Sequence, residues 1–370
     1  MHIDSQFDGG NITVLACEDP LNIQVAIQKD TESEFLQWFS FRLYAPKGTD
    51  IHINIINAHE TSYTKGWINY KARYSYDEEI WRQADTDYDG GLHIKLTMEQ
   101  DSVSIAYFAP YPLARHHQLI RWCQGQGATI RSLGKSIQGR SMDLIRTGTG
   151  PKQLWFIGRQ HPGETMAEWW MEGFCEALFD PANPLSSSLR QEATLHIVPN
   201  MNPDGSFLGN LRCNAAGANL NREWKNPTQE RSPEVLFVRN EMERTGVNFC
   251  LDIHGDESIP YNFFAGPEGI PAYNKTIERS YKNYTQYLLD RSPDFQTAYG
   301  YPKNLPGKAN LAVCSNYIAE YFRCVAITVE QPFKDSDITP MPDVGWSPQR
   351  AKHFGAACLA ACVPLLHDLD

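Results

Sequence analysis

The chain has 370 residues, of which 42% are hydrophobic and 12% aromatic, so it can bury the core of one large domain or of two moderate ones. Its formal net charge of −11 argues against a broad basic surface for nucleic acid, which needs concentrated lysine and arginine. The nine cysteines form no CxxC or CxxH pair, and we interpret them as reduced thiols. The N-terminus is unlike a signal peptide and no apolar run could span a membrane, so we expect a cytoplasmic protein with no membrane or nucleic-acid partner.

The first part of the chain is predicted to be rich in β-strands. Apolar residues alternate with polar ones in the segments 23–27, 39–43, 51–55 and 92–98, and turn-forming residues separate these segments. This pattern is typical of an antiparallel β-sandwich. The pattern changes after Pro112, which predicts an N-terminal β-sandwich domain at residues 1–115 and a second domain at residues 116–370.

The second part alternates short apolar strands with helices. Strands are predicted at 154–157, 194–198, 249–253 and 325–329, and the clearest helices at 165–179 and 351–366. Such alternation indicates an α/β fold with a largely parallel sheet flanked by helices. Ligands in these folds bind beyond the carboxyl ends of the strands, so functional residues are sought there.

Candidate metal ligands follow two of these strands. His161 and Glu164 are three residues apart just before the first predicted helix, so both side chains can point to one place. His254 follows the strand at 249–253 and precedes a glycine that frees the turn. A catalytic zinc takes three such nitrogen and oxygen ligands and leaves one position for water. His196 is a competing histidine, but it lies inside a predicted strand and is expected to face the sheet.

The segment 200–224 is rich in amides and contains two arginines, Arg212 and Arg222. A structural turn needs glycine and proline rather than these side chains. The planar guanidinium group binds a carboxylate with two hydrogen bonds, and an arginine close to a metal can stabilise a developing oxyanion.

The order of motifs HPGE, NPDG, R, NR, IHG and VEQP resembles the carboxypeptidase A-like zinc peptidases, and among them the cytosolic carboxypeptidase branch, which has a β-rich domain before the catalytic one. The resemblance covers nearly the whole chain. It implies a zinc metallocarboxypeptidase that hydrolyses the C-terminal peptide bond of a peptide or protein by promoted-water attack. It also implies one Zn²⁺ per chain, bound by His161, Glu164 and His254.

The same resemblance implies the roles of four further residues. Arg212 would correspond to the arginine that polarises the scissile carbonyl, and Glu330 to the general base. Asn221 and Arg222 would correspond to the pair that binds the terminal carboxylate of the substrate. Such a pair explains cleavage at a chain end only, because an internal peptide bond has no carboxylate to offer.

The substrate preference and the oligomeric state stay open at this stage. Eukaryotic members of the branch that shorten acidic tails carry a basic residue about fifteen positions before the general base, where this chain has Ser315; Lys303 and Lys308 are the nearby alternatives. Tyr301 and Tyr317 are the candidates for a tyrosine that caps the substrate.

Two other functions are consistent with the motifs. One is a zinc amidohydrolase or deacylase acting on N-acyl amino acids, as in the aspartoacylase-like relatives. The other is a non-catalytic peptide-binding module. The NPDG motif and the leading β domain argue against the first, and a base beside the metal argues against the second.

Overall fold

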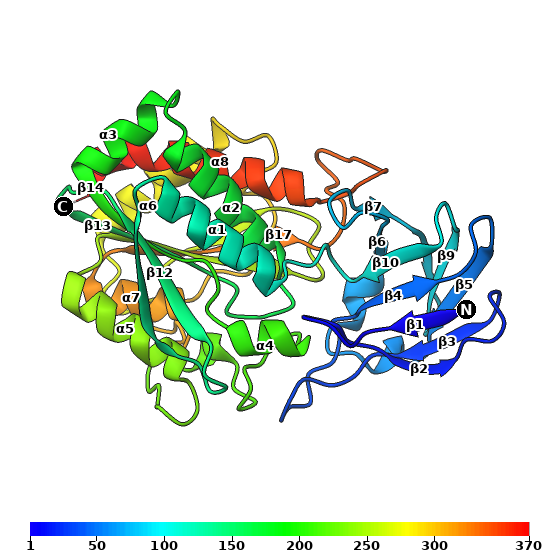
Figure 1. Ribbon diagram of the computed structural model, residues 1–370. Helices are drawn as coiled ribbons and strands as arrows, with labels where there is room; N and C mark the ends of the chain where they lie inside the picture. The colour runs from blue at the N-terminus through cyan, green and yellow to red at the C-terminus, as the bar shows by residue number, and fades with distance from the viewer. Residues whose placement is uncertain (370) are drawn as a thin grey trace.

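The computed structural model describes residues 1–369 as two parts, a β-rich N-terminal part and a larger α/β part (Figure 1). The N-terminal part has two five-stranded sheets, in the orders β1-β4-β10-β6-β7 and β2-β3-β5-β9-β8. Their bounds are β1 His2–Asp4, β2 Thr13–Ala16, β3 Ile23–Ala26, β4 Ser40–Tyr44, β5 Asp50–Ile55, β6 Arg73–Ser75, β7 Arg82–Gln83, β8 Asp85–Tyr88, β9 Leu92–Thr97 and β10 Ser102–Ala106, with 3-10 turns η1 Ala58–Glu60 and η2 Thr64–Trp67.

The alternation in the sequence sets which face of each of these strands is buried. In β5, Ile51, Ile53 and Ile55 are buried while the residues between them are not, as a strand with one face on a core requires. The predicted antiparallel domain is confirmed, with one local exception: β3 pairs with β5 in parallel.

The α/β part is built on a seven-stranded sheet in the order β11-β12-β14-β13-β15-β17-β16. The four strands β14, β13, β15 and β17 are parallel, and the strands outside them pair antiparallel. Their bounds are β11 Thr129–Lys135, β12 Ser141–Thr147, β13 Lys152–Gly158, β14 Ala193–Val198, β15 Phe249–Asp256, β16 Phe263–Ala265 and β17 Val325–Pro332. The predicted mixed, largely parallel sheet is confirmed.

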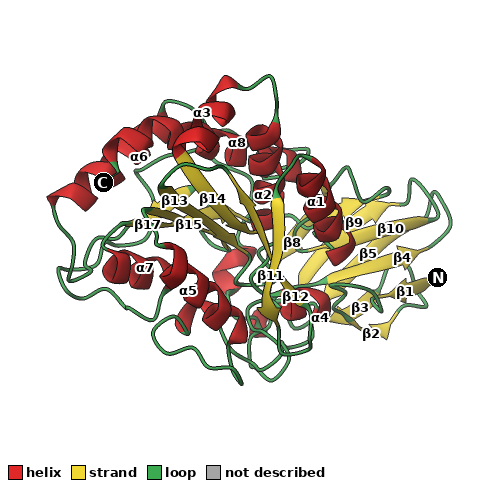
Figure 2. Cartoon of the chain, turned by 60° about the vertical axis from the view of Figure 1, so that its left-hand side comes forward, coloured by secondary structure: helices red, strands yellow, loops and turns green. Residues whose placement is uncertain are grey.

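Helices cover both faces of this sheet (Figure 2). One face carries α1, α2, α3, α6 and α8, and the other carries α5 and α7 (Figures 1 and 2). Their bounds are α1 Leu113–Gly125, α2 Met166–Phe179, α3 Pro184–Glu192, α4 Pro203–Leu208, α5 Pro233–Thr245, α6 Lys275–Leu289, α7 Cys314–Phe322 and α8 Pro348–Leu365, with 3-10 turns η3 Leu220–Arg222 and η4 Leu366–Asp368. The sheet between two helical layers is buried on both faces, which explains the continuous apolar strands.

Three details of the structure refine the sequence expectations. The NPDG segment lies partly in a short helix, α4, which Asn202 caps through its side chain. The strand expected to end at Val329 continues to Pro332, because β15 pairs with it as far as Asp256. Residue 115, the proposed domain boundary, lies in the first turn of α1, which begins at Leu113.

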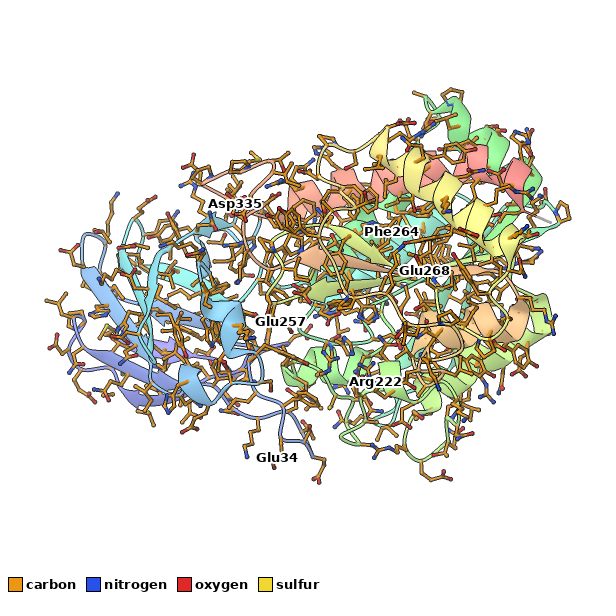
Figure 3. The ribbon with its side chains drawn as sticks, turned by 180° about the vertical axis from the view of Figure 1, so that it is seen from behind. Glu34, Arg222, Glu257, Phe264, Glu268 and Asp335 are labelled. Carbon is orange, nitrogen blue, oxygen red and sulfur yellow. The ribbon has the colours of Figure 1, made fainter. Side chains whose placement is uncertain are left out.

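The two parts share one continuous hydrophobic core. The fully buried Arg73 of β6 donates Nη2 to the backbone oxygens of Phe333, at 2.9 Å, and Trp346, at 3.4 Å, across the boundary. Glu257, at the end of β15, lies where the two parts meet (Figure 3). All nine cysteines, which fall within the described residues, carry free thiols. Among residues 1–369, no helix has both the length and the apolar composition that crossing a bilayer would require.

Candidate active site

The residues predicted to carry chemistry gather at the carboxyl ends of the central strands. His161 follows β13, His254 lies near the end of β15, and Glu330 is the direct partner of His254 on β17. His161 and Glu330, together with Glu164, border a cavity of about 1240 Å³. Parallel strands end at one edge of the sheet, so side chains distant in sequence meet there.

His161, Glu164 and His254 form a buried cluster whose ligand atoms all lie within 4.8 Å of one another. The carboxylate of Glu164 is 2.6 Å from Nδ1 of His161 and 2.8 Å from Nδ1 of His254, and the two Nδ1 atoms are 3.2 Å apart. Three donor atoms that face one point in this way fit a tetrahedral zinc with one open position.

The outer nitrogens of both histidines are held by acceptors. Nε2 of His254 is 2.9 Å from the carboxylate of Asp252, and Nε2 of His161 is 3.0 Å from Oδ1 of Asn219. These partners place the proton on Nε2 and leave Nδ1 of each ring free to bind a metal. The Asp252 carboxylate is itself fixed by Nε2 of Gln160, at 2.8 Å from each oxygen.

The ionisation of the cluster suits a bound cation. Burial and the positive charge of Arg212 lower the pKa of His161 to about 4, so this ring is neutral at pH 7. Burial alone would raise the pKa of Glu164, but the two imidazoles hold it well below its usual value. Burial alone would lower the pKa of His254, but the carboxylates of Asp252 and Glu164 raise it. The negative surroundings that favour a proton on His254 favour a metal ion in its place.

Arg212, Asn221 and Arg222 line the same cavity. Nε of Arg212 is buried and has no hydrogen-bond partner among the described residues. Arg222 donates Nη1 to the backbone oxygen of Asn221, at 2.7 Å, and Asn221 is fixed because its Oδ1 accepts from the backbone of Cys314, at 2.9 Å. Burial and the nearby Arg212 lower the pKa of Arg222, so two positive groups share one site that an anion would stabilise.

Glu330 is buried, and its Oε2 has no hydrogen-bond partner in the described part of the chain. Burial and the negative charges of Glu164 and Asp256 raise the pKa of Glu330 to about 8. The hydroxyl of Tyr301 donates to Asp256, at 2.7 Å, and lies 3.3 Å from Oε1 of Glu330. Of the two tyrosines considered as a cap, Tyr301 therefore reaches the cavity.

Tyr317, the other candidate, packs away from the cavity. Its ring is stacked on Tyr321, with centroids 5.6 Å apart, and lies 6.3 Å from Trp224. It is not among the residues that line the cavity.

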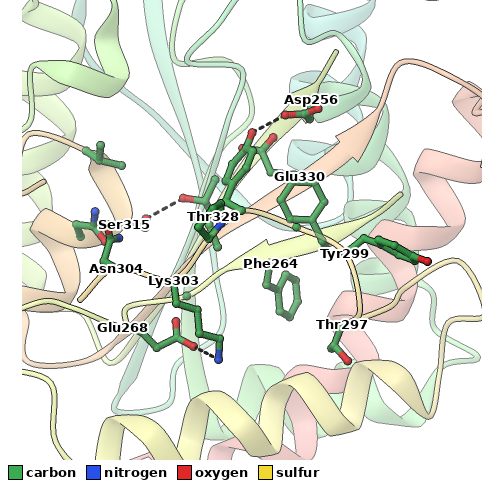
Figure 4. Close-up of a pocket in the computed structure, with 18 of the residues that line it drawn as sticks. Asp256, Phe264, Glu268, Thr297, Tyr299, Lys303, Asn304, Ser315, Thr328 and Glu330 are labelled. Atoms are coloured by element: carbon green, nitrogen blue, oxygen red, sulfur yellow. Dashed lines mark hydrogen bonds and ion pairs between the residues drawn. The ribbon is translucent and has the colours of Figure 1, made fainter. Parts of the chain in front are cut away.

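The cavity extends to a neutral pair of hydroxyls and a charged pair (Figure 4). The Ser315 and Thr328 hydroxyls are 2.7 Å apart and buried. Nζ of Lys303 is 2.9 Å from the carboxylate of Glu268, and the Lys303 side chain is 78% exposed. Lys308 does not line the cavity. Ser315 therefore contributes a neutral hydroxyl to the cavity, and the nearby Lys303 is paired with Glu268.

His196 is not part of the site. It stacks on Trp155, with ring centroids 4.5 Å apart, and its Nε2 is 2.8 Å from Gln153. This agrees with the expectation that it faces the sheet.

Comparison with known proteins identifies the family. The family described as zinc carboxypeptidase matches residues 124–342, and the cytosolic carboxypeptidase N-terminal domain matches residues 3–108. The chain belongs to the zinc carboxypeptidase family. Its α/β part is therefore the catalytic domain, and the prediction of a metallocarboxypeptidase is confirmed. The family favours neither the deacylase nor the non-catalytic module.

Solved zinc carboxypeptidase relatives have the same fold over the whole chain. A metallo-carboxypeptidase from Burkholderia cenocepacia is 42% identical, with a TM-score of 0.97 and 99% of each chain covered. One from Pseudomonas aeruginosa, in complex with (2-guanidinoethylmercapto)succinic acid, is 43% identical, with a TM-score of 0.96 and both chains fully covered.

Curated relatives agree with this assignment. An uncharacterised protein of Zymomonas mobilis is 48% identical over all of this chain and 97% of its own. Cytosolic carboxypeptidase 6 of Mus musculus is 26% identical over 71% of this chain, which spans 54% of the mouse protein.

Sequence reasoning missed the residues that orient the candidate metal ligands. Asp252 is two residues before His254 on one strand, so their side chains point to the same face, and this spacing could have identified it. Asn219 and Gln160 had no comparable signal, because their contacts depend on how distant segments pack.

Proposed function

We propose that this metallocarboxypeptidase removes the last residue from peptides or proteins with a free C-terminus, and that it holds one zinc ion through His161, Glu164 and His254. One observation carries the proposal. Arg212 Nε and Glu330 Oε2 are both buried and unpaired among the described residues, and both belong to residues that line the cavity beside the metal cluster. Buried polar atoms without partners are costly, so a ligand that satisfies both is expected there.

Asn221 and Arg222 are the proposed binding site for the terminal carboxylate. The guanidinium group of Arg222 offers the planar pair of donors that a carboxylate accepts. The side-chain amide of Asn221, which is fixed by its hydrogen bond from the backbone of Cys314, lies beside it. The Pseudomonas aeruginosa relative holds a succinic acid derivative, which is a dicarboxylic acid. This supports a site that takes carboxylates.

Glu330 and Arg212 are the proposed catalytic residues. Zinc, when bound, acidifies water and polarises a carbonyl group. The raised pKa of Glu330 applies to the site without metal, and the positive charge of a bound zinc would favour the carboxylate form. In that form Glu330 accepts a proton from the water that attacks the last peptide bond and gives this proton to the leaving amine, so no other acid is needed. Arg212 donates hydrogen bonds to the carbonyl oxygen as it gains negative charge.

The location and division of the chain are part of the same proposal. The free thiols and the similarity to proteins named cytosolic carboxypeptidases support a cytoplasmic location. The two family matches, which end at residue 108 and begin at residue 124, support a division near residue 115 into the β-sandwich domain and the catalytic domain.

Replacing Glu330 with Gln tests the assignment of the base. Glu330→Gln keeps the size of the side chain and removes its ability to accept a proton, so we expect kcat to fall by about 10²–10⁴-fold while the zinc content stays the same. The assay is a panel of peptides that differ only in the C-terminal residue, read by mass spectrometry. The exposed Glu230, on a loop, provides the matched control Glu230→Gln, which should keep full activity.

Two outcomes would contradict the proposal. Full activity of Glu330→Gln would remove the base from the mechanism. The other outcome is that zinc-loaded wild-type protein cuts none of the peptides but hydrolyses N-acyl amino acids. That result would favour the deacylase function over the carboxypeptidase function.

A further inference from the structure

The loop that carries Arg212 is anchored by the N-terminal domain. The carboxylate of Asp30, which is 4% exposed, accepts hydrogen bonds from three consecutive backbone N–H groups. Oδ1 accepts from Leu211 at 2.6 Å, and Oδ2 accepts from Arg212 at 2.7 Å and from Cys213 at 2.9 Å. One side chain of the N-terminal domain therefore fixes the backbone on both sides of Arg212.

Neighbouring contacts hold the start of the same loop. Asn11 donates Nδ2 to the backbone oxygen of Gly209 at 2.8 Å, and the backbone of Thr31 donates to Oδ1 of Asn210 at 3.1 Å. Gly209 has φ of +70°, and a Cβ there would lie 2.5 Å from the oxygen of Gly10. The loop and the N-terminal domain thus approach too closely for a side chain at this position.

The side chain of Arg212 also lies against the N-terminal domain. Its guanidinium carbon is 5.5 Å from the ring centroid of Phe35 and 5.6 Å from that of Tyr63. Cation–π contacts of this kind are attractive and directional. Since Tyr63 and Arg212 both line the cavity, these rings limit where the guanidinium group can point.

The charge of Asp30 agrees with this geometry. Burial raises its pKa to about 6, and the three N–H groups and Arg212 oppose the rise. At pH 7 the group is a carboxylate, which is the form that can accept all three hydrogen bonds.

We propose that Asp30 is a positioning residue for catalysis, and that the N-terminal domain completes the active site by aiming Arg212 at the scissile carbonyl. This rests on the role of Arg212 in the proposed function. Loss of the carboxylate would leave buried N–H groups without acceptors, which is unfavourable, so we expect the loop to relax instead. A shift of about 1 Å in a group that stabilises the transition state lowers the rate by about 10²-fold.

A double-mutant cycle in the full-length zinc enzyme tests the proposal. Asp30→Asn removes one acceptor and presents an N–H₂ to backbone donors. We expect kcat to fall about 10–100-fold with a small change in KM, because Arg212 acts on the transition state. In the Arg212→Ala background, Asp30→Asn should have almost no further effect, since the group that it positions is already absent.

Controls separate positioning from loss of stability. Asp101→Asn also removes a carboxylate of the N-terminal domain that accepts a backbone N–H, from Lys47 at 2.9 Å, but this contact lies within that domain and not on the Arg212 loop. It should leave kcat unchanged. If Asp30→Asn does not fold, Phe35→Leu removes one ring from Arg212 and should lower kcat several-fold, again only when Arg212 is present.

The outcomes distinguish the two proposals. One outcome is that Arg212→Ala lowers kcat, while Asp30→Asn (or Phe35→Leu in its place) either lowers kcat by the same factor with and without Arg212 or does not lower it. In that case the positioning role is wrong and the role of Arg212 stands. If Arg212→Ala keeps full activity, the assignment of Arg212 fails, and the positioning role fails with it.

Discussion

At the scale of single residues, the active site depends on partners that hold each functional group in one orientation. Asp252 and Asn219 set the tautomers of the histidines that we propose to bind the metal. Behind them lies a second buried cluster, in which Glu168 accepts from Arg159, from Asn200 at 2.9 Å and from Nδ1 of His116 at 2.8 Å. Glu168 lies on the first turn of α2, directly after the turn that carries Glu164, so this cluster supports the site.

The charge of His116 makes the stability of this cluster depend on pH. Although burial would lower its pKa, hydrogen bonds to Asp143 and Glu168 raise the pKa of His116 to about 9. A pKa above the unfolded value of about 6.5 means that the protonated form is stabilised in the folded state. This stability is fully present below pH 6.5 and is lost as the pH rises through 9, with a magnitude on the order of 3 kcal/mol.

The measurement compares wild type with His116→Gln by denaturant unfolding between pH 6 and pH 10. The neighbouring His117 and Arg159 are common to both proteins, so the difference in unfolding free energy reports on His116. The advantage of the wild type should shrink as the pH rises. A constant difference would show that His116 is neutral in the folded protein.

At the scale of elements, helices α2 and α8 pack backbone against backbone. A Cβ on Gly173 of α2 would lie 2.2 Å from the backbone oxygen of Lys352, and one on Gly355 of α8 would lie 2.2 Å from that of Trp170. Each glycine therefore allows backbone contact with the other helix. This packing fixes the position of α2, whose first turn follows the turn that carries Glu164.

Gly173→Ala should force the two helices apart and destabilise the protein by about 1–3 kcal/mol, because backbone cannot move aside as a side chain can. The measurement is the midpoint of thermal unfolding. Gly125→Ala at the end of α1 is the control, since a Cβ there meets nothing within 4 Å. That change should be neutral or stabilising by up to about 1 kcal/mol. Equal midpoints for Gly173→Ala and the wild type would contradict the proposed close packing.

At the scale of the whole molecule, the two domains share a core and a buried arginine. Burial lowers the pKa of Arg73 to about 10, yet it remains charged at pH 7 and is held by backbone oxygens of the catalytic domain. Separation of the domains would expose this core and leave those oxygens without their partner.

We therefore expect calorimetry to show one unfolding transition for the whole chain. Removal of zinc by a chelator should lower the midpoint of this single transition, because zinc at about 100 times its Kd stabilises the folded state by about 2.7 kcal/mol. All three proposed ligands are in the catalytic domain, but the N-terminal domain should unfold with it. Two peaks, of which only one responds to the chelator, would show that the domains unfold independently.

The sequence by itself determined the two-part fold, the strands and the metal-binding motifs, because these follow from local patterns. Alternation sets the buried face of β5, and a histidine directly after a buried strand identifies the ligand edge of the sheet. The family resemblance also followed from the order of short motifs, which can be read from the sequence without the structure.

Only the tertiary structure decided which side chains from distant parts of the sequence contact the residues of those motifs. Asp30 contacts residues 211–213, which are more than 180 positions away, and Asn219 reaches His161 from a loop. Tyr301 rather than Tyr317 reaches the cavity, although both are tyrosines in the same region of the chain. A contact between distant segments depends on how whole elements pack, and no local pattern in one sequence records that.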